Sequence, residues 1–151
     1  RVRGNLRTAA GEGAHDPLMA RNLMDFGGVG YIQIDAGRVG GITSAYELAR
    51  HAEKARVVYV NHTFTTPLAL SASLQPYAGL ESSHLCEYPT ETSALAQNLT
   101  LQRLRPDADG LVTIGNEPGL GITPNPGTLR QYLVPVEIRV GGRLLYSTPT
   151  V

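Results

Sequence analysis

The chain has little cysteine, little lysine and no long apolar run. Its 151 residues include a single cysteine, Cys86, so no disulfide can form within the chain. No charged and then apolar leader precedes the first folded-looking stretch, and we therefore expect a cytoplasmic location. No apolar run approaches the ~20 residues that a bilayer-spanning helix needs, so we expect no membrane partner.

Charge of one sign is also lacking, because 13 basic and 13 acidic residues cancel. There is no basic cluster and no alternation of basic with aromatic residues, a pattern that excludes a nucleic-acid surface or an anionic membrane surface. Small neutral molecules or small anions remain as the expected partners. Lys54 is the only lysine.

The first half of the chain repeats a short apolar run followed by a helical pattern. Predicted strands cover residues 6–12, 29–35 and 56–62, and a fourth covers 83–89. Strands that alternate with helices of 10 to 15 residues are typical of βαβ units, which require parallel strands and right-handed crossovers. The length suits one ordinary domain with a sizeable core.

Helix starts are marked by capping residues. Asp16 precedes Pro17, and Thr66 precedes Pro67, which places a side-chain oxygen and then proline at the start of a helix; Thr43 is the expected cap of the helix between them. The helix after Pro17 is expected to end near Gly27. Apolar residues recur at helical spacing in the second helix, at Ala45, Leu48, Ala49 and Ala52.

Each predicted strand ends in a titratable residue, and these are Glu12, Asp35, His62 and Glu87. Parallel strands bring their carboxyl ends to one rim, so we expect the four side chains to converge there. Any one of them alone has a structural interpretation: a carboxylate can cap a helix, and His62 can be satisfied by a nearby carbonyl. Four such residues on successive strand ends favour a functional site.

The chain changes character after Glu87. Residues 90–110 are polar and irregular, residues 116–127 form a connector rich in proline and glycine, and 128–133 favour a short helix. Two extended runs follow, joined by Gly141 and Gly142, which is typical of a β-hairpin. A hairpin interrupts the βα series, so we divide the chain into residues 1–133 and 134–151.

Five motifs together resemble one known family. They are AAGEG at Glu12, IQIDAGRVGGIT at Asp35, VNHTF at His62, LCEYP at Glu87 and PGLGI at 118–122. In order and spacing they resemble the carboxy-terminal half of mandelate racemase and muconate lactonizing enzyme relatives, in the enolase superfamily. The resemblance implies an α/β fold, the C-terminal half of a (β/α)7β TIM-type barrel with about four parallel strands. The hairpin would return to the family's capping domain.

The resemblance also implies roles for the strand-end residues. Glu12 resembles the third carboxylate ligand of an essential Mg²⁺. Asp35 and His62 resemble an Asp–His dyad whose histidine is the base, and Glu87 resembles a glutamate that hydrogen-bonds the substrate carboxylate or its enediolate. No lysine lies near Asp35, which argues against the branch of the superfamily that uses lysine on this side of the barrel.

Arg38 follows Asp35 by three residues and has two interpretations. It can contact the substrate, or it can hold the loop that leads into the next helix. Both remain open from the sequence.

The chemistry of these residue types agrees with the implied roles. A proton α to a carboxylate is only weakly acidic, so its removal needs a cation for the developing charge and a base at the carbon. Hard carboxylate oxygens such as those of Glu12 suit Mg²⁺. A histidine can take and return a proton near neutral pH when an acceptor, here Asp35, fixes its tautomer.

A protonated His62 can donate to a departing β-hydroxyl, which gives dehydration. The resemblance implies a sugar acid as the substrate, because dehydration of sugar acids is the common outcome among family members with this dyad. Racemisation or epimerisation of a 2-hydroxy acid begins with the same proton transfer and is the alternative. A non-catalytic half-barrel module is the second alternative. A serine or cysteine nucleophile has little support, since the chain contains no Gly-x-Ser-x-Gly turn.

A full barrel of this type takes roughly 250 residues, more than this chain has. The family would supply the lysine strand and the first two metal carboxylates upstream of Arg1, so we expect this chain alone to be inactive. Its open sheet would have two bare edges, which predicts self-association as a homo-oligomer.

Overall fold

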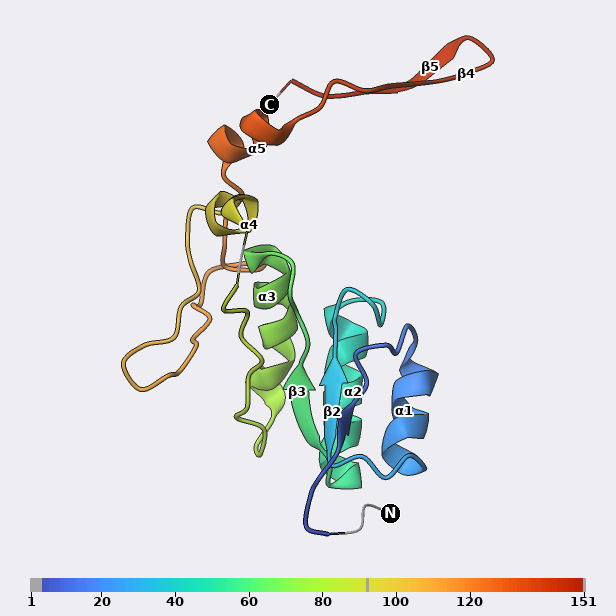
Figure 1. The fold of residues 1–151 in the computed structure, drawn as a ribbon, viewed down its shortest axis with the longest axis vertical. Helices are drawn as coiled ribbons and strands as arrows, with labels where there is room; N and C mark the ends of the chain where they lie inside the picture. Colours follow the sequence, from blue (N-terminus) through green and yellow to red (C-terminus); the bar gives the residue numbers. More distant parts are fainter. Residues whose placement is uncertain (1–3, 92, 151) are drawn as a thin grey trace.

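A three-stranded parallel sheet lies at the centre of the computed structural model, which describes residues 4–91 and 93–150 (Figure 1). Its strand order is β1-β2-β3, with β1 at Ala9–Ala10, β2 at Tyr31–Ile34 and β3 at Val58–Asn61. A helix follows each strand: α1 at Pro17–Asp25, α2 at Ile42–Ala55 and α3 at Pro67–Leu74. The predicted alternation of parallel strands and helices is confirmed.

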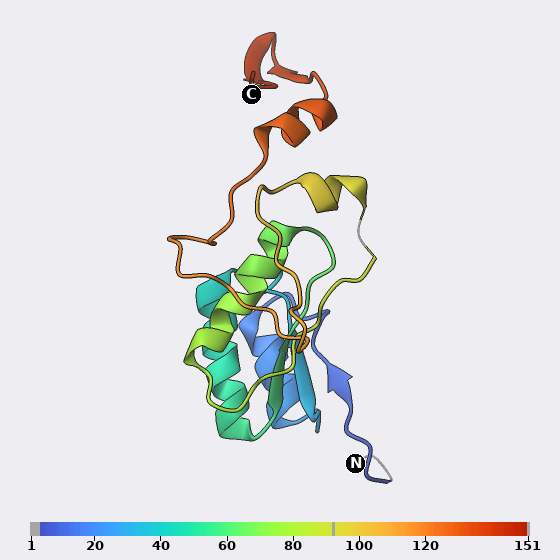
Figure 2. The same ribbon diagram turned by 90° about the vertical axis from the view of Figure 1, so that its left-hand side faces the viewer.

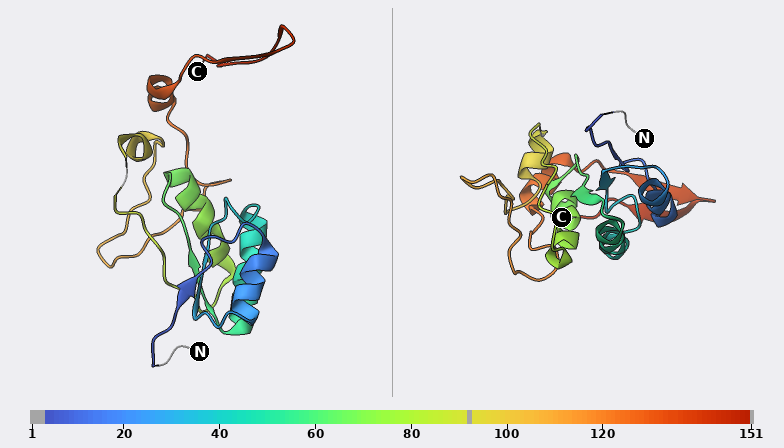
Figure 3. Two further views of the ribbon diagram at one scale, coloured as in Figure 1. Left: turned by 45° about the vertical axis from the view of Figure 1, so that its right-hand side comes forward. Right: turned by 90° about the horizontal axis from the view of Figure 1, so that it is seen from below.

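The three helices cover one face of the sheet, as Figures 2 and 3 show from two directions. Side chains alternate along each strand, so Ile32, Ile34 and Tyr59 point toward the helices and are fully buried. They join a core with the apolar side of α2, where all four residues predicted at helical spacing are buried: Ala45, Leu48, Ala49 and Ala52. The core therefore lies between sheet and helices.

Two of the three predicted helix caps are confirmed. The Asp16 side chain accepts a hydrogen bond from the Met19 backbone N–H, and that of Thr66 accepts one from Ala69. The predicted cap at Thr43 is wrong, because the cap lies two residues earlier, at Gly41, whose φ of 109° turns the chain into the helix that begins at Ile42. Helix α1 ends at Asp25, two residues before the expected glycine.

The predicted fourth strand over residues 83–89 is wrong in detail. A 3₁₀ turn, η1 at Gln75–Gly79, follows α3, and the chain then returns to β3, where Glu87 contacts the Asn61 side chain. Residues 83–89 form no backbone ladder with β3 and are not a strand. Pro89 offers no N–H for such a ladder. Side chains make the connection instead, and the described part of the chain contributes three parallel strands.

The second half of the chain contains one unpredicted helix and one confirmed hairpin. Helix α4, at Ala94–Asn98, forms in the region expected to be irregular, because Ser93 caps it and Ala96 is buried. Helix α5, at Pro126–Tyr132, agrees with the short helix predicted there. Strands β4 (Glu137–Val140) and β5 (Arg143–Ser147) pair antiparallel, and the two predicted glycines form the turn between them.

The hairpin extends away from the rest of the molecule (Figure 1). Every residue of its two strands is exposed, and five of these are large and apolar: Ile138, Val140, Leu144, Leu145 and Tyr146. A two-stranded hairpin is at best marginally stable without something packed against it. The exposed apolar hairpin is thus a surface that another element can cover.

No helix in residues 4–91 or 93–150 is long and apolar enough to cross a membrane.

Replacing Leu48 by alanine tests the central position of α2. Leu48 is 0 % exposed, so we expect Leu48→Ala to lower the free energy of unfolding by about 2–5 kcal/mol through lost burial and the cavity left behind. Leu18, on α1, is 67 % exposed, and Leu18→Ala is the matched control, expected to change it by about 0.5 kcal/mol or less. Urea unfolding followed by circular dichroism measures both; equal losses would contradict the assignment.

Candidate active site

The site lies where the three parallel strands end. Ile34 pairs with Asn61, so the next residues in register, Asp35 and His62, leave the sheet side by side. The backbone N–H of His62 still donates to the Ile34 carbonyl, at 2.9 Å. This bond carries the alignment of β2 and β3 beyond the last strand pair and holds the histidine next to the aspartate.

His62 is held between two carboxylates. Its Nδ1 lies 3.2 Å from Asp35 Oδ2, and its Nε2 lies 3.0 Å from Glu12 Oε2. The imidazole side chain is only 5 % exposed, whereas that of Glu12 is 63 % exposed. Three of the four predicted residues therefore meet in one cluster, with the ring buried and one carboxylate open to solvent.

The geometry assigns different tasks to the two ring nitrogens. When Nδ1–H donates to Asp35, Nε2 carries a lone pair and can accept a proton. Nε2 can donate to Glu12 only after it has gained that proton. The Asp35 contact therefore sets the tautomer, and the Glu12 contact belongs to the doubly protonated ring.

Asp35 is itself fixed by its own loop. Its Oδ1 accepts a hydrogen bond from the Gly37 backbone N–H, at 2.8 Å, which leaves Oδ2 for the histidine. A carboxylate held on one oxygen by the backbone and on the other by imidazole has little freedom to rotate. The aspartate is therefore built to orient His62.

Glu12 reaches the cluster because of the glycine before it. Gly11 has a φ of +126°, and a Cβ there would lie 2.7 Å from the Gln33 carbonyl oxygen, so only glycine fits this close approach to β2. The Arg38 side chain donates to the Glu12 carbonyl, at 2.6 Å, and its Nε lies 3.9 Å from Asp35 Oδ2. These contacts show Arg38 holding the loops together; its contact with a substrate stays a prediction.

Glu87 lies at the same sheet but makes different contacts from the other three. Its Oε2 accepts a hydrogen bond from Gln33 Nε2, at 3.2 Å, and its backbone is bonded to the Asn61 side chain. Gln33 alternates with Ile32 and Ile34 on β2, so it points to the face that the helices do not cover.

Sequence reasoning missed both Gln33 and Asn61. A polar residue two positions before Asp35 shares the face of that aspartate, and this period-2 signal could have identified Gln33. Nothing local distinguishes Asn61, because its importance depends on a segment 26 residues away.

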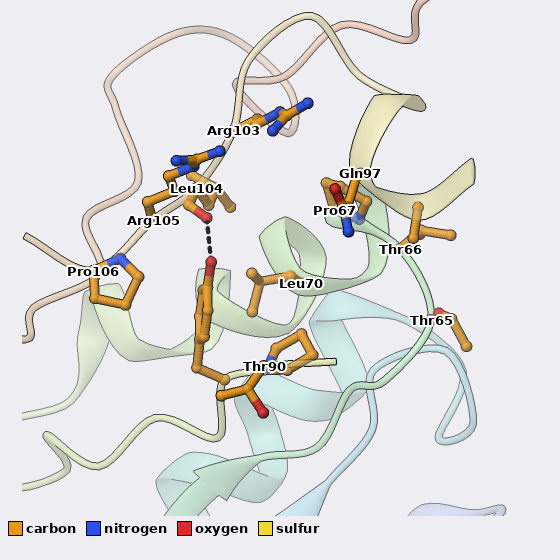
Figure 4. A pocket seen from close by; sticks show the side chains of 13 residues that line it. Thr65, Thr66, Pro67, Leu70, Thr90, Gln97, Arg103, Leu104, Arg105 and Pro106 are labelled. Atoms are coloured by element: carbon orange, nitrogen blue, oxygen red, sulfur yellow. Dashed lines mark hydrogen bonds between the residues drawn. The ribbon is translucent and has the colours of Figure 1, made fainter. Parts of the chain in front are cut away.

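A separate cavity lies outside this cluster. Its volume is about 360 Å³, and it is lined by the first half of α3 and the loop before it, residues 88–90, α4 and residues 103–106 (Figure 4). Arg103 and Arg105 project from one side, and the Tyr88 hydroxyl donates to the Leu104 carbonyl at 2.9 Å. None of the four predicted residues lines it. We place the site at the strand ends, because the buried His62 meets both its orienting Asp35 and the solvent-exposed Glu12 there.

The side chains of this cluster fit the implied Mg²⁺ in part. Glu12 offers hard oxygens and is open to solvent, which fits one ligand position. The described residues contain no group of three or more histidine, cysteine, aspartate or glutamate side chains arranged to hold a metal ion. Both carboxylate oxygens of Asp35 are already hydrogen-bonded, one to the Gly37 backbone N–H and the other to His62. The described residues thus fit as the source of one ligand and do not form a complete metal site among themselves.

Successive β-α units with titratable residues at the strand ends define this molecule as part of an α/β barrel. The chain belongs to the enolase C-terminal domain-like family, whose model matches residues 1–128. The expected relationship to mandelate racemase and muconate lactonizing enzyme relatives, and the half-barrel fold class, are confirmed.

Individual relatives agree with this family. The crystal structure of a predicted mandelate racemase from Rhodobacter sphaeroides is 51 % identical, with a TM-score of 0.92 over 98 % of this chain and 38 % of that one. A 3,6-anhydro-D-galactonate cycloisomerase from Zobellia galactanivorans is 26 % identical, with a TM-score of 0.76 over 86 % of this chain and 36 % of its own.

Among curated proteins, a D-galactonate dehydratase from Xanthomonas campestris pv. campestris is 28 % identical over 128 residues, or 82 % of this chain and 34 % of that protein. The chain therefore covers about a third of the length of each of these three relatives.

The single thiol should react slowly in the folded chain. Burial raises the pKa of the Cys86 thiol, and the nearby Glu87 carboxylate raises it further. A raised pKa means a smaller thiolate fraction at a given pH, so we expect a thiol-disulfide reagent to modify Cys86 several-fold more slowly than in the unfolded chain at mildly alkaline pH. Absorbance of the released reagent gives both rates. Equal rates would show that the thiol is not protected.

Proposed function

We propose that the protein to which this chain belongs removes the proton α to the carboxylate of a sugar acid and eliminates the β-hydroxyl, giving a 2-keto-3-deoxy acid. One observation supports this more than any other: the buried His62 ring lies between Asp35 and Glu12 at the ends of parallel strands. A base, its orienting group and an open carboxylate are the parts that this reaction needs.

Proton transfer at His62 follows from the tautomer that Asp35 sets. Nε2 takes the α proton, so the substrate C–H bond breaks and an N–H bond forms. The same N–H then donates to the β-hydroxyl, which leaves as water as its C–O bond breaks, and the ring returns to its neutral form. One histidine thus serves as base and then as acid, while Asp35 stabilises the protonated ring in between.

Glu12 would hold Mg²⁺ as one of several ligands, with the remaining ligands supplied from outside this chain. When bound, the ion supplies positive charge that stabilises the negative charge developing on the substrate carboxylate. Glu87 would hydrogen-bond the substrate carboxylate or the enediolate formed from it. Arg38 would contact the substrate from the loop after Asp35.

We further propose that residues 1–133 form the partial barrel with its connector and that residues 134–151 belong to a capping domain. The exposed apolar side chains of β4 and β5 support a covering partner of this kind. A barrel needs eight strands and the described residues contribute three, which supports our expectation that this chain is inactive alone. Self-association and a cytoplasmic location stay predictions.

The similar proteins favour two reactions that begin with the same proton transfer, namely dehydration and racemisation. A D-galactonate dehydratase and a 3,6-anhydro-D-galactonate cycloisomerase are similar to this chain, which favours a sugar acid as substrate. A predicted mandelate racemase is 51 % identical, which favours racemisation or epimerisation of a 2-hydroxy acid as the second candidate.

Replacing His62 tests the base. In the complete protein, with Mg²⁺ and a panel of sugar acids in deuterated water, we expect His62→Asn to lower α-proton exchange by about 10²–10⁴-fold. The matched control is His51→Asn, because His51 also pairs with an aspartate, Asp25 at 2.7 Å, but between the outer helices. That control should exchange at the unmodified rate. Exchange that survives in His62→Asn would eliminate the histidine as base.

Product analysis in the same experiment separates the candidate reactions. A 2-keto-3-deoxy acid indicates dehydration, and recovery of the epimer without loss of water indicates racemisation. Absence of exchange with every acid in the unmodified protein would favour the non-catalytic module.

Replacing Glu12 tests the metal. We expect Glu12→Gln to raise the Mg²⁺ concentration needed for half-maximal exchange by at least about tenfold, since even partners outside the ligand shell contribute 10–100-fold in affinity. Glu47, exposed on α2, provides the control Glu47→Gln, which should leave the Mg²⁺ dependence unchanged. An identical titration for Glu12→Gln and the unmodified protein would remove Glu12 from the ligand set.

A further inference from the structure

Asn61, the last residue of β3, uses its side chain where a strand would use its backbone. It is fully buried, its Nδ2 donates to the Glu87 carbonyl at 3.0 Å, and its Oδ1 accepts from the Glu87 N–H at 2.9 Å. A carboxamide presents a donor and an acceptor side by side, as a peptide group does. These two hydrogen bonds to the Glu87 backbone therefore take the place of one pair of backbone hydrogen bonds that a β ladder between β3 and residues 83–89 would form.

The remaining hydrogen-bonding capacity of Asn61 is used as well. The second N–H of Nδ2 donates to Ser73 Oγ, at 3.1 Å, and the Ser73 hydroxyl in turn donates to the Leu70 carbonyl. The Asn61 backbone N–H donates to the Tyr77 hydroxyl, at 2.8 Å. A buried amide with every hydrogen placed has one favoured orientation, because a flip would leave polar groups unpaired.

Tyr77 connects this amide to the returning chain. Its hydroxyl lies 3.1 Å from Asn61 Oδ1 and 2.7 Å from the Leu85 carbonyl, so it can donate to either. Burial raises the pKa of Tyr77, which keeps the hydroxyl protonated and able to donate. The ring also packs edge-on against Tyr59, with centroids 5.2 Å apart.

Glu87 is thus held at two points. Asn61 fixes its backbone, and Gln33 donates to its carboxylate from β2 at 3.2 Å. Both partners stand on strands of the sheet, whereas the segment that carries Glu87 forms no ladder with β3. The position of the carboxylate therefore depends on two side chains.

We propose that Asn61 is a positioning residue for Glu87: its carboxamide pairs with the Glu87 backbone in place of a β ladder and so sets where that carboxylate stands at the site. Tyr77 and Gln33 complete the arrangement. This inference rests on the proposed function through the role given there to Glu87.

The first test measures the pairing itself. Asn61→Asp keeps the size and the acceptor but removes the donor to the Glu87 carbonyl. We expect the Glu87 amide and its neighbours in 83–89 to exchange with deuterium at least about tenfold faster, since local opening becomes easier. The control is Asn116→Asp at an exposed loop position. Unchanged exchange in Asn61→Asp overturns the proposal, whether or not the protein proves to be an enzyme.

The second test measures the consequence for turnover in the complete protein. A displaced carboxylate costs up to about 10²-fold in rate, and we expect a loss of that order in α-proton exchange for Asn61→Asp. If Asn61 acts through Glu87, the same substitution should cost little more in a Glu87→Gln background. Full additivity of the two losses would show that Asn61 has only a general structural role.

A milder variant covers the case in which Asn61→Asp does not fold. Tyr77→Phe keeps the ring and removes the hydroxyl that bridges Asn61 and Leu85, and it should show a smaller loss that also disappears in Glu87→Gln. If Glu87→Gln by itself keeps full activity, the proposed role of Glu87 fails. If Glu87→Gln loses activity and the Tyr77 and Asn61 losses add to it, the positioning role fails and the role of Glu87 stands.

Discussion

The parallel pairing of β2 with β3 is the constraint on which the candidate site depends. Their register continues by one hydrogen bond, from His62 N–H to the Ile34 carbonyl, past the last strand pair. That bond places the imidazole next to Asp35, and a shift of one residue would turn either side chain to the opposite face of the sheet. The tautomer of His62, and with it the basic nitrogen, follows from this register.

Burial on one face of the sheet makes that register unambiguous. Ile32, Ile34 and Tyr59 are enclosed by the helices, so β2 and β3 cannot slip without exposing them. The opposite face carries Gln33 and leads to Asp35 and His62, and among the described residues α1, α2 and α3 all leave it uncovered (Figure 2). The face covered by helices contributes stability, and the open face leads to the candidate site. Barrel enzymes divide the two tasks in a similar way, with catalytic residues at the carboxyl ends of the strands.

The edge of the sheet at β3 shows how side chains can take over from backbone pairing. Residues 83–89 run beside β3 without a ladder; Asn61 and Gln33 hold Glu87 there, and the Tyr77 hydroxyl donates to the Leu85 carbonyl. Buried amides and hydroxyls are selective because each must find a partner, so this network specifies one arrangement of the segment. In the exposed apolar hairpin, by contrast, every residue of β4 and β5 is exposed, so no other described element packs over these strands.

Much of the fold and the site could be predicted from the sequence by itself. Apolar runs, caps at Asp16 and Thr66, and the glycine pair of the hairpin are local signals, and the crossover rule places Glu12, Asp35 and His62 at one rim. Tertiary structure alone decided that 83–89 is not a strand, that Arg38 holds the Glu12 carbonyl, and that Asn61 and Gln33 hold Glu87. The reason is physical: periodicity records which side chains leave water, whereas a hydrogen bond between residues 26 to 54 positions apart depends on how the packed elements meet.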